Sequence, residues 1–528
     1  MSPARVEHVI MRRTFRATAR VGCVFLLFAG FCGAAPAHAD LYGAVGEYKK
    51  GAYSDAFKGF MALAKLGQPT AQLDVARLYF IGRGVRQNYI YAYAWAHLAA
   101  QNGAAGANEI ADQLGPMLAP GSRQVAEQVT AAYTPDALGR TLLPEPLSPQ
   151  AVGQQWQDMQ KPPCWPVKVF DPGFPPIARM NKNQGRVLVE YTVMPDGTAR
   201  LPRVLYAYPP QEFEANAREA ALRSRYARRA GAAPLRCVEW EDFSLRDGYT
   251  QSGGFTKPNG GGSAMGAQTS GTAIDPNRLG GMRAGGILYF DNNRVPLPQS
   301  YGDLNRINTN LKYNADGGND PRADLYYALL NEGAPELGGV PSTGLSWMVK
   351  AAQAGLPLAQ FQVGYRLLIG LDCRPDPAKA LKWLQMAAAQ HETTADVILA
   401  VRLLSGTPDA TATAAAKEWL EQAVAGGNEY GELYLSALLA SAPEPQARDP
   451  KRALLLLDKI YVGVKDEPIA GEIRAAAQAG TGDFVDAIQS EQGAIAEAHK
   501  LGWDLAPLEQ RLAVYAAHKP WDGDLLSF

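Results

Sequence analysis

Histidine and cysteine are the residue types most often used to bind metals, and this sequence uses both sparingly. Only four histidines follow residue 39, namely His97, His391, His499 and His518. There is no His-Glu-x-x-His pair and no Cys-x-x-Cys pair, the spacings that place two metal ligands on one helix or turn. His97 lies in an Ala- and Trp-rich helical stretch, where a packed repeat residue is the commoner role. We therefore predict no metal site.

Motifs for nucleophilic catalysis and phosphate binding are also absent. The sequence has no Gly-x-Ser-x-Gly elbow and no phosphate loop. Gly82-Arg83-Gly84 lacks the third glycine of a dinucleotide fingerprint and falls between two predicted helices instead of after a strand. A pair of distant carboxylates leaves no such local motif, so a carboxylate hydrolase is kept as a third hypothesis. We expect no catalytic residue, no cofactor and no small-molecule substrate.

Two polar clusters fit structural roles better than binding roles. The first comprises Asn314, Asp316, Asn319 and Asp320. Its spacing misses the EF-hand loop, and turns account for Asn and Asp better than calcium does. The second comprises Arg218, Arg223, Arg225, Arg228, Arg229 and Arg236. These arginines could meet an anionic partner, but a solvated helix face is the commoner role.

Length and charge set the broad class. A chain of 528 residues exceeds one compact core, and two to four domains are expected. The formal net charge of −1 gives no general electrostatic case for nucleic acid or an anionic membrane.

The first 39 residues have the features of a cleavable signal peptide. Four arginines between Arg12 and Arg20 precede an apolar run from Val21 to Ala35, and Ala37-His38-Ala39 supplies a small-x-small cleavage site before Asp40. The apolar run is short for a mature membrane anchor. We expect a periplasmic protein; the alternative is an inner-membrane anchor with the chain facing the periplasm.

A repeat can be measured directly. Small residues recur at steps of 36, at Ala323, Ala359, Ala395 and Gly431. A large apolar residue follows each one 24 positions later, at Trp347, Trp383, Trp419 and Leu455, and the same offset joins Ala71 to Trp95. Each unit predicts two helices separated by a Gly- or Pro-containing loop. One such hairpin cannot bury its own apolar face, so the units should stack into an α-solenoid with these tryptophans in its core.

The N-terminal unit resembles a known family. Its matching residues are Ala71, Leu73, Tyr79, Gly82, Gly84-Val85, Ala92, Trp95, Ala99-Ala100 and Gly103. This pattern resembles the Sel-one-like repeat, a relative of the tetratricopeptide repeat. The resemblance implies a protein-interaction scaffold and no chemistry.

Between the repeats the periodicity changes to that of strands. Val187, Val189, Tyr191 and Val193 alternate with other residues, and Pro195-Asp196-Gly197 follows as a turn. A second strand over 203–208, a helix over 212–226 and a last strand over 236–245 complete a small ββαβ domain.

The same region resembles the TonB C-terminal domain. The motifs are Phe174-Pro175-Pro176-Ile177-Ala178, then Gln184-Gly185-Arg186-Val187, then the Asp196-Gly197 turn. Phe174 stands where the family usually has Tyr. In the family this sheet binds an extended peptide of an outer-membrane receptor, which implies β-augmentation at an edge strand. By position, the peptide-binding edge would carry Arg236, Val238, Trp240 and Asp242.

Cysteine placement fits that small domain. Cys164 and Cys237 both fall within it, and a disulfide between them would help a limited core. A buried thiol at Cys237 and an exposed one at Cys164 is the alternative. Cys373 is then left over in a repeat loop, as a free or intermolecular thiol.

The expected fold is therefore multidomain, α plus α/β: an α-solenoid of hairpin repeats with an inserted ββαβ domain. The predicted segments are a signal peptide (1–39), N-terminal repeats (40–140), a linker (141–160), the TonB-like domain (161–248), a Gly-rich linker (249–286), an unassigned stretch (287–320), further repeats (321–465) and capping helices (466–528).

The function that follows is a non-enzymatic, protein- or peptide-binding scaffold of the cell envelope, with an outer-membrane receptor among the candidate partners. The alternative is a TonB-like energy transducer for transport across the outer membrane. Such transducers keep an uncleaved N-terminal helix, so the fate of residues 1–39 separates the two hypotheses.

Overall fold

The computed structural model describes residues 40–159, 163–181, 185–208, 212–246, 249–252, 312, 320–331, 341–405, 408–442, 444–460, 467–523 and 525. The predicted signal peptide and most of the stretch 253–319 lie outside these residues, as do Asn314, Asp316 and Asn319. Within the described part of the chain, no helix is both long and apolar enough to span a bilayer.

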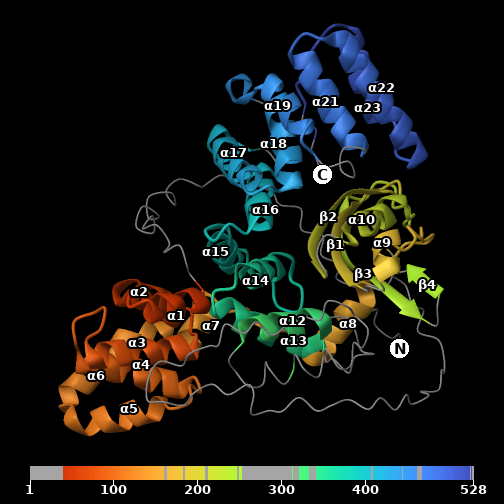
Figure 1. Cartoon of the computed structure of the whole chain (residues 1–528). Helices are drawn as coiled ribbons and strands as arrows, with labels where there is room; N and C mark the ends of the chain where they lie inside the picture. Colours follow the sequence, from red (N-terminus) through yellow and green to blue (C-terminus); the bar gives the residue numbers. More distant parts are fainter. Residues whose placement is uncertain are drawn as a thin grey trace, which may run out of the picture.

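Helical hairpins make up most of the chain (Figure 1). The N-terminal block contains α1 (Leu41–Lys49), α2 (Tyr53–Lys65), α3 (Pro69–Ile81), α4 (Tyr89–Gln101), α5 (Ala107–Leu114), α6 (Pro120–Thr130) and α7 (Pro135–Thr141). The second block contains α12 (Pro321–Asn331), α13 (Pro341–Gln353), α14 (Pro357–Ile369), α15 (Pro377–Ala388), α16 (Thr393–Leu404), α17 (Ala410–Ala425), α18 (Glu429–Ser441) and α19 (Pro450–Leu457). After it come α21 (Pro468–Gly480), α22 (Phe484–Lys500) and α23 (Ala506–Ala516). Consecutive helices pack on one another, which confirms the predicted solenoid.

The 36-residue period appears in the turns between hairpins. The left-handed backbone conformation recurs at Gly67, Gly103, Gly355, His391 and Gly427, with φ between 64° and 93°. The last three are spaced by 36, as are the first two. Glycine adopts this conformation without strain and is common just after a helix, whereas His391 holds it against a steric cost.

The second helix of each hairpin carries the repeated tryptophan. Trp95 and Trp383 are 2% and 0% exposed. Trp347 and Trp419 are half-buried against the core that contains Trp383, whereas Trp95 belongs to the core of the N-terminal block. The fourth unit departs from the pattern, because Leu455 is 65% exposed. Helix α19 is only eight residues long and buries Ala453, Leu456 and Leu457 instead.

The inserted domain forms one antiparallel sheet. Its strands are β1 (Gly185–Val193), β2 (Ala199–Tyr208), β3 (Leu235–Arg246) and β4 (Tyr249–Ser252), in the order β2-β1-β3-β4. Helix α10 (Glu214–Arg223) separates β2 from β3, so the predicted ββαβ order is confirmed, and α9 (Pro176–Asn181) precedes the sheet. Strand β4 was not predicted: it lies at the start of the expected Gly-rich linker and pairs with the end of β3, from Phe243 opposite Ser252 to Arg246 opposite Tyr249.

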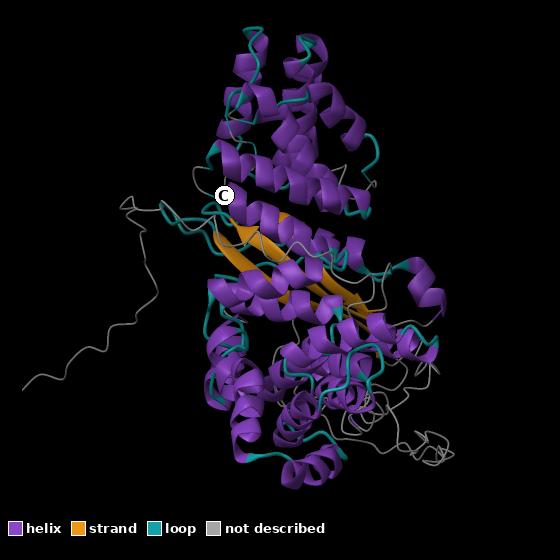
Figure 2. Ribbon diagram, turned by 90° about the vertical axis from the view of Figure 1, so that its left-hand side faces the viewer, coloured by secondary structure: helices purple, strands orange, loops and turns teal. Residues whose placement is uncertain are grey.

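Helices cover both faces of this sheet (Figure 2). On one face Val187, Val189 and Tyr191 form a core with Phe213 and Ala217 at the start of α10. On the other face Leu188, Leu205 and Trp240 join the core of the second repeat block. Because successive residues of a strand point to opposite faces, one short strand supplies both cores.

The predicted linker 141–160 is instead an ordered part of the repeat block. It contains α8 (Pro149–Met159), whose Trp156 is 8% exposed and donates from Nε1 to Asp372 Oδ1 at 2.8 Å. Just before it, the Leu142 carbonyl accepts from Trp383 Nε1 at 3.0 Å. The prolines of this segment favour a linker, but proline also suits the first turn of a helix, and Pro149 begins α8.

A disulfide joins Cys164 to Cys237, whose Cα atoms lie 5.5 Å apart. It ties the segment before α9 to the start of β3. Cys373 is 1% exposed, and burial raises the pKa of its thiol to about 12. That burial removes the intermolecular role that the sequence left open for Cys373.

Thiol counting tests this arrangement in protein that begins at Asp40. Native protein should show no reactive thiol, because Cys373 is buried and the other two cysteines are bonded. Unfolding without reductant should expose Cys373 alone, and reduction should then expose all three cysteines. Reduction should also lower the free energy of unfolding by about 2–5 kcal/mol.

The matched control is Cys373→Ser, which should show no thiol even when unfolded without reductant. A thiol that reacts rapidly in the native wild-type protein would contradict the arrangement.

Candidate functional site

The histidines do not form a site. His97 in α4 stacks on Tyr93 with ring centroids 5.6 Å apart, His391 lies in a turn, and His499 lies in the last turn of α22. His518, beyond α23, stacks on Phe484 at 5.2 Å. No group of three or more metal-binding side chains occurs in the described ranges.

The predicted edge-strand residues all face the second repeat block. Val238 and Trp240 are 8% and 9% exposed and belong to its core. Arg236 Nε lies 2.9 Å from Glu190 Oε1, and Asp242 pairs with Arg186, whose guanidinium covers the Trp240 ring at 4.7 Å. Val238 and Trp240 thus hold the sheet against the solenoid, whereas Arg236 and Asp242 pair with residues of β1 in the same sheet.

The backbone edge of β3 is a separate feature. Its inner edge pairs with β1 over the whole of Leu235–Phe243. Its outer edge pairs with β4 only from Phe243 onward, and no strand of the described chain pairs with it over 235–242. A peptide strand could add at this outer edge without displacing the side chains that face the solenoid.

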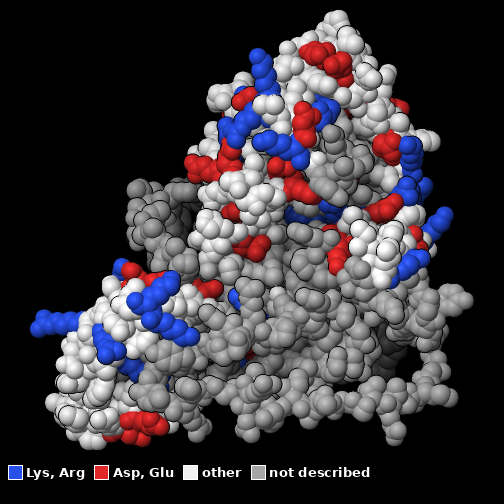
Figure 3. Space-filling view, in the orientation of Figure 1, with Lys and Arg blue, Asp and Glu red and all other residues white. Residues whose placement is uncertain are grey.

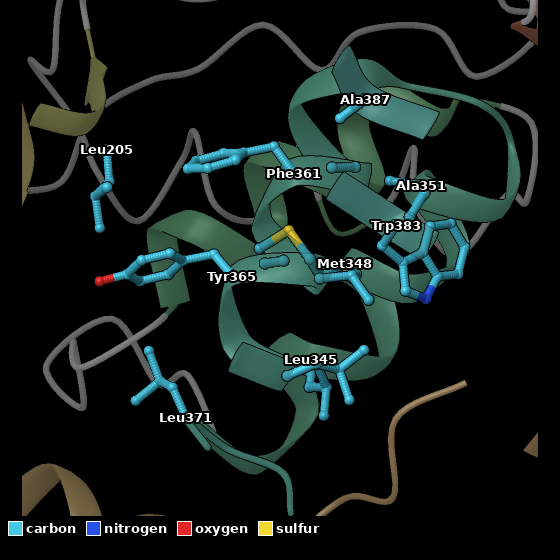
Figure 4. Packing of buried hydrophobic residues seen from close by; sticks show 14 of the residues in the cluster. Leu205, Leu345, Met348, Ala351, Phe361, Tyr365, Leu371, Trp383 and Ala387 are labelled. Carbon is cyan, nitrogen blue, oxygen red and sulfur yellow. The ribbon is translucent and has the colours of Figure 1, made fainter. Parts of the chain in front are cut away.

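Glu190 is the centre of the contact between the sheet and the solenoid. It is 3% exposed, it lies opposite Arg203 in the β1–β2 register, and its Oε2 pairs with Arg203 Nη2. Tyr365 of α14 donates its hydroxyl to Glu190 Oε1 at 2.7 Å. Figure 4 shows Tyr365 and Phe361 pointing to the side where Leu205 of β2 lies, away from Trp383. One carboxylate thus joins three strands and one repeat helix.

The protonation states of this network are fixed by its geometry. Burial opposes ionisation of Glu190, but the charges of Arg203 and Arg236 and the hydrogen bonds from Arg203 and Tyr365 outweigh it and hold its pKa below the usual value. Burial, reinforced by the Glu190 charge, raises the pKa of the Tyr365 hydroxyl well above its usual value. Glu190 is therefore ionised and Tyr365 is a neutral donor at pH 7.

A bulge in β2 shapes the neighbouring space. The β1–β2 register shifts between Glu190 and Thr192, and Leu201 takes φ of 50°, which is strained for a branched residue. The bulge sends Leu201 into the core of α16 and α18, and the Pro202 carbonyl accepts from the Tyr430 hydroxyl of α18.

A cavity of about 160 Å³ lies beside the bulge. Its walls come from β1, β2 and β3 on one side and from α16 and α18 on the other. They comprise Glu190, Tyr191, Thr192, Leu201, Arg203, Pro234, Arg236, Val401 and Tyr434. Arg203 is 5% exposed, and its Nε and Nη1 atoms have no hydrogen-bond partner within the described ranges. The cavity therefore combines one carboxylate, two guanidinium groups and short apolar walls.

The arginine cluster predicted from the sequence does not form one surface. Arg218 is 7% exposed and pairs with Glu429 of α18 at 3.5 Å, whereas Arg223 pairs with Glu219 on the exposed side of α10. Arg225 and Arg229 donate to nearby backbone carbonyls. In Figure 3 acidic and basic side chains are interspersed over the visible face.

Sequence reasoning missed the central residues of this site. Glu190 and Tyr365 are 175 residues apart, and no local pattern links them. The one signal was a carboxylate in the middle of an apolar strand, where an unpaired charge would be costly.

The N-terminal block offers a different kind of surface, which the sheet does not cover. Tyr79 stacks on Tyr91 with ring centroids 5.2 Å apart, and Phe57 meets Tyr79 edge-on at 5.2 Å. Tyr89 and Tyr91 are 44% and 37% exposed. Arg83 lies over the Tyr53 ring at 5.2 Å. Exposed aromatic rings beside an arginine are typical of protein-binding surfaces.

Comparison with known proteins gives the same two components. The Sel1 repeat model matches residues 69–103, 357–391 and 399–428, and the model of the Gram-negative bacterial TonB protein C-terminal matches residues 171–233. Among curated proteins no match is found.

Two solved structures are similar to the chain. A Sel1 repeat protein from Oxalobacter formigenes is 20% identical, with 40% of this chain and 98% of that one covered and a TM-score of 0.29. A protective antigen of uropathogenic Escherichia coli strains, which displays an SLR fold, is 14% identical, with 90% of this chain and 72% of that one covered and a TM-score of 0.32. The hairpins α3–α4, α14–α15 and α16–α17 thus match the Sel1 repeat model, and the region that contains α9, β1, β2 and α10 matches the TonB C-terminal model.

Proposed function

We propose that this chain is a non-enzymatic periplasmic scaffold that recruits a protein partner through its N-terminal repeats. In this proposal the TonB-like domain is a built-in ligand of the second repeat block. Sel1 repeats and TonB C-terminal domains both act by binding proteins, which supports a protein partner in general.

The observation that carries the proposal is the burial of the second face of the sheet. Leu188, Tyr206 and Trp240 would lie in water if the domain left the solenoid, and Glu190 would lose Tyr365. Exposure of that much apolar surface opposes release. A domain that must travel to an outer-membrane receptor needs a stable free form, which this packing disfavours.

The N-terminal block remains available because the sheet packs elsewhere. The rings of half-buried Tyr79 and exposed Tyr89 and Tyr91 lie on α3 and α4, the repeat that matches the Sel1 model from 69 to 103. Stacked repeats present such side chains on one continuous surface. This surface is the candidate binding site for the protein partner.

The alternative function is a TonB-like energy transducer. The outer edge of β3, which pairs with no described strand over 235–242, favours it, because a receptor peptide could add there while the sheet stays docked. The two functions use different surfaces and can be separated by experiment.

Site-specific photo-crosslinking in cells separates them. A photoreactive residue at Tyr89 should give a discrete protein adduct, whereas one at Val485 on α22, which is 77% exposed, should not. A third probe at Asp242 tests the strand edge, since 45% of its side chain is exposed. An adduct at Asp242 with none at Tyr89 would favour the transducer and overturn the scaffold.

The N-terminus tests the compartment. If residues 1–39 are a cleaved signal peptide, protein purified from the soluble periplasmic fraction should begin at Asp40. Mass spectrometry of the intact protein measures this directly. A chain that keeps these residues and sediments with inner membranes would contradict the proposal.

Glu190→Gln tests the contact that holds the domain. At pH 7 this change leaves buried Arg203 without its counter-charge, and it should lower the free energy of unfolding by about 3–5 kcal/mol. Because the folded-state pKa of Glu190 lies below the unfolded value, its contribution is complete above about pH 4.3 and is lost as pH falls through the lowered pKa. The difference between variant and wild type should therefore shrink at low pH.

Urea unfolding at pH 7 and at pH 3 measures both effects. Glu497→Gln is the matched control, because Glu497 pairs with Lys500 at the surface and should contribute less than about 1 kcal/mol. If the two substitutions lower the free energy of unfolding at pH 7 by the same small amount, Glu190 does not hold the sheet against the solenoid.

A further inference from the structure

The charges around the cavity beside the β2 bulge do not balance. One carboxylate, Glu190, faces two guanidinium groups, Arg203 and Arg236, so the walls carry a formal charge of about +1. Arg203 is buried and Arg236 is 43% exposed, so the excess positive charge lies on the open side of the cavity, where it favours an anion from solution.

We propose that this cavity binds a small monocarboxylate anion, held by Arg203 and Arg236 between the TonB-like sheet and the second repeat block. This site goes beyond the scaffold function and does not depend on it. The ligand carries one negative charge, because a single carboxylate neutralises the walls, whereas a phosphate dianion would leave an excess negative charge.

Unused hydrogen-bond donors support the assignment. Arg203 gives Nη2 to Glu190, while its Nε and Nη1 are buried and have no partner in the part of the chain that the structure describes. Arg236 uses Nε for Glu190 Oε1, and 43% of its side chain is exposed, so it can turn toward an incoming ligand. Guanidinium groups bind carboxylates with paired, charge-assisted hydrogen bonds.

The remaining walls set the size and shape of the ligand. Leu201, Pro234 and Val401 are apolar, and the Tyr434 hydroxyl interacts electrostatically with Glu190, Arg203 and Arg236. A cavity of about 160 Å³ is close in size to the roughly 150 Å³ engineered cavity that takes up benzene. A carboxylate with a short apolar tail fits both the charge and the walls.

Such a ligand would also act on the contact between the domains. Its carboxylate would meet arginines of β2 and β3, and its tail would meet Val401 of α16. Because it binds only the docked form, it would stabilise the whole chain in proportion to its concentration.

Calorimetry and thermal unfolding of the chain from Asp40 onward test the site, with acetate and butyrate as probes and sodium phosphate as the competing anion. All samples are matched in ionic strength with sodium chloride. The monocarboxylates should bind and raise the melting temperature, with butyrate binding more tightly than acetate. Phosphate should bind at least tenfold more weakly.

Three variants locate the binding. Arg236→Gln should weaken butyrate binding about tenfold or more, because it removes a charge-assisted donor. Arg223→Gln removes the same charge from the exposed side of α10 and should leave binding unchanged. Val401→Phe fills the apolar end of the cavity and keeps both arginines, so it should abolish binding without lowering the melting temperature in the absence of butyrate.

The outcomes are exclusive. Butyrate binding that is lost in Arg236→Gln and Val401→Phe and kept in Arg223→Gln supports the site. Any of four results would overturn it. These are no butyrate binding to the wild-type chain, equal loss of binding in both arginine variants, unchanged binding in Val401→Phe, and tighter binding of phosphate than of butyrate.

Discussion

The buried Glu190 carboxylate is the interaction on which the arrangement of this protein depends. A carboxylate that is 3% exposed is tolerated only where its charge is matched, and here Arg203, Arg236 and Tyr365 supply the match from two strands and a repeat helix. Apolar contacts such as those of Leu188 and Trp240 contribute most of the attraction, but they would tolerate a shifted sheet. The carboxylate would not, because any slip leaves it unpaired. The apolar contacts thus supply most of the attraction between the sheet and the solenoid, and the charged network fixes the position of the sheet on the solenoid.

What the sequence predicted well is what depends on neighbours along the chain. The 36-residue spacing follows from hairpins that repeat, and the left-handed turns at Gly355 and Gly427 carry it in the structure. The strand alternation from Val187 to Val193 is equally local, and it predicted β1. The patterns over 203–208, 212–226 and 236–245 likewise predicted β2, α10 and β3. In these cases a local pattern of side chains determines the conformation of the backbone.

What the sequence could not predict depends on segments that meet only after folding. The pairing of Glu190 with Tyr365 spans 175 residues and has no local signature. The prolines of 141–160 predict a linker if proline is read only as a helix breaker, yet helices α3, α14 and α15 also begin with proline. Leu455 kept its place in the repeat but not its burial, because α19 turns a different side to the core. In each case the deciding contact comes from another part of the chain.

The two repeat blocks also contact each other directly. A solenoid that ends in an open hairpin exposes apolar surface, and the first hairpin of the second block, α12–α13, meets the start of the N-terminal block instead of solvent. Leu41 N donates to the Ala354 carbonyl at 3.0 Å, and Gln353 Nε2 donates to the Leu66 carbonyl at 2.7 Å. Tyr42 of α1 donates to Asp320 and lies under Arg322 at the start of α12. The N-terminal repeats therefore act as a cap for the second block.

Since the second block also holds the sheet, the aromatic surface of α3 and α4 and the outer edge of β3 are held at a fixed separation. A partner that contacted both would have to match that separation, so the scaffold can select a partner by its shape as well as by the chemistry of each surface.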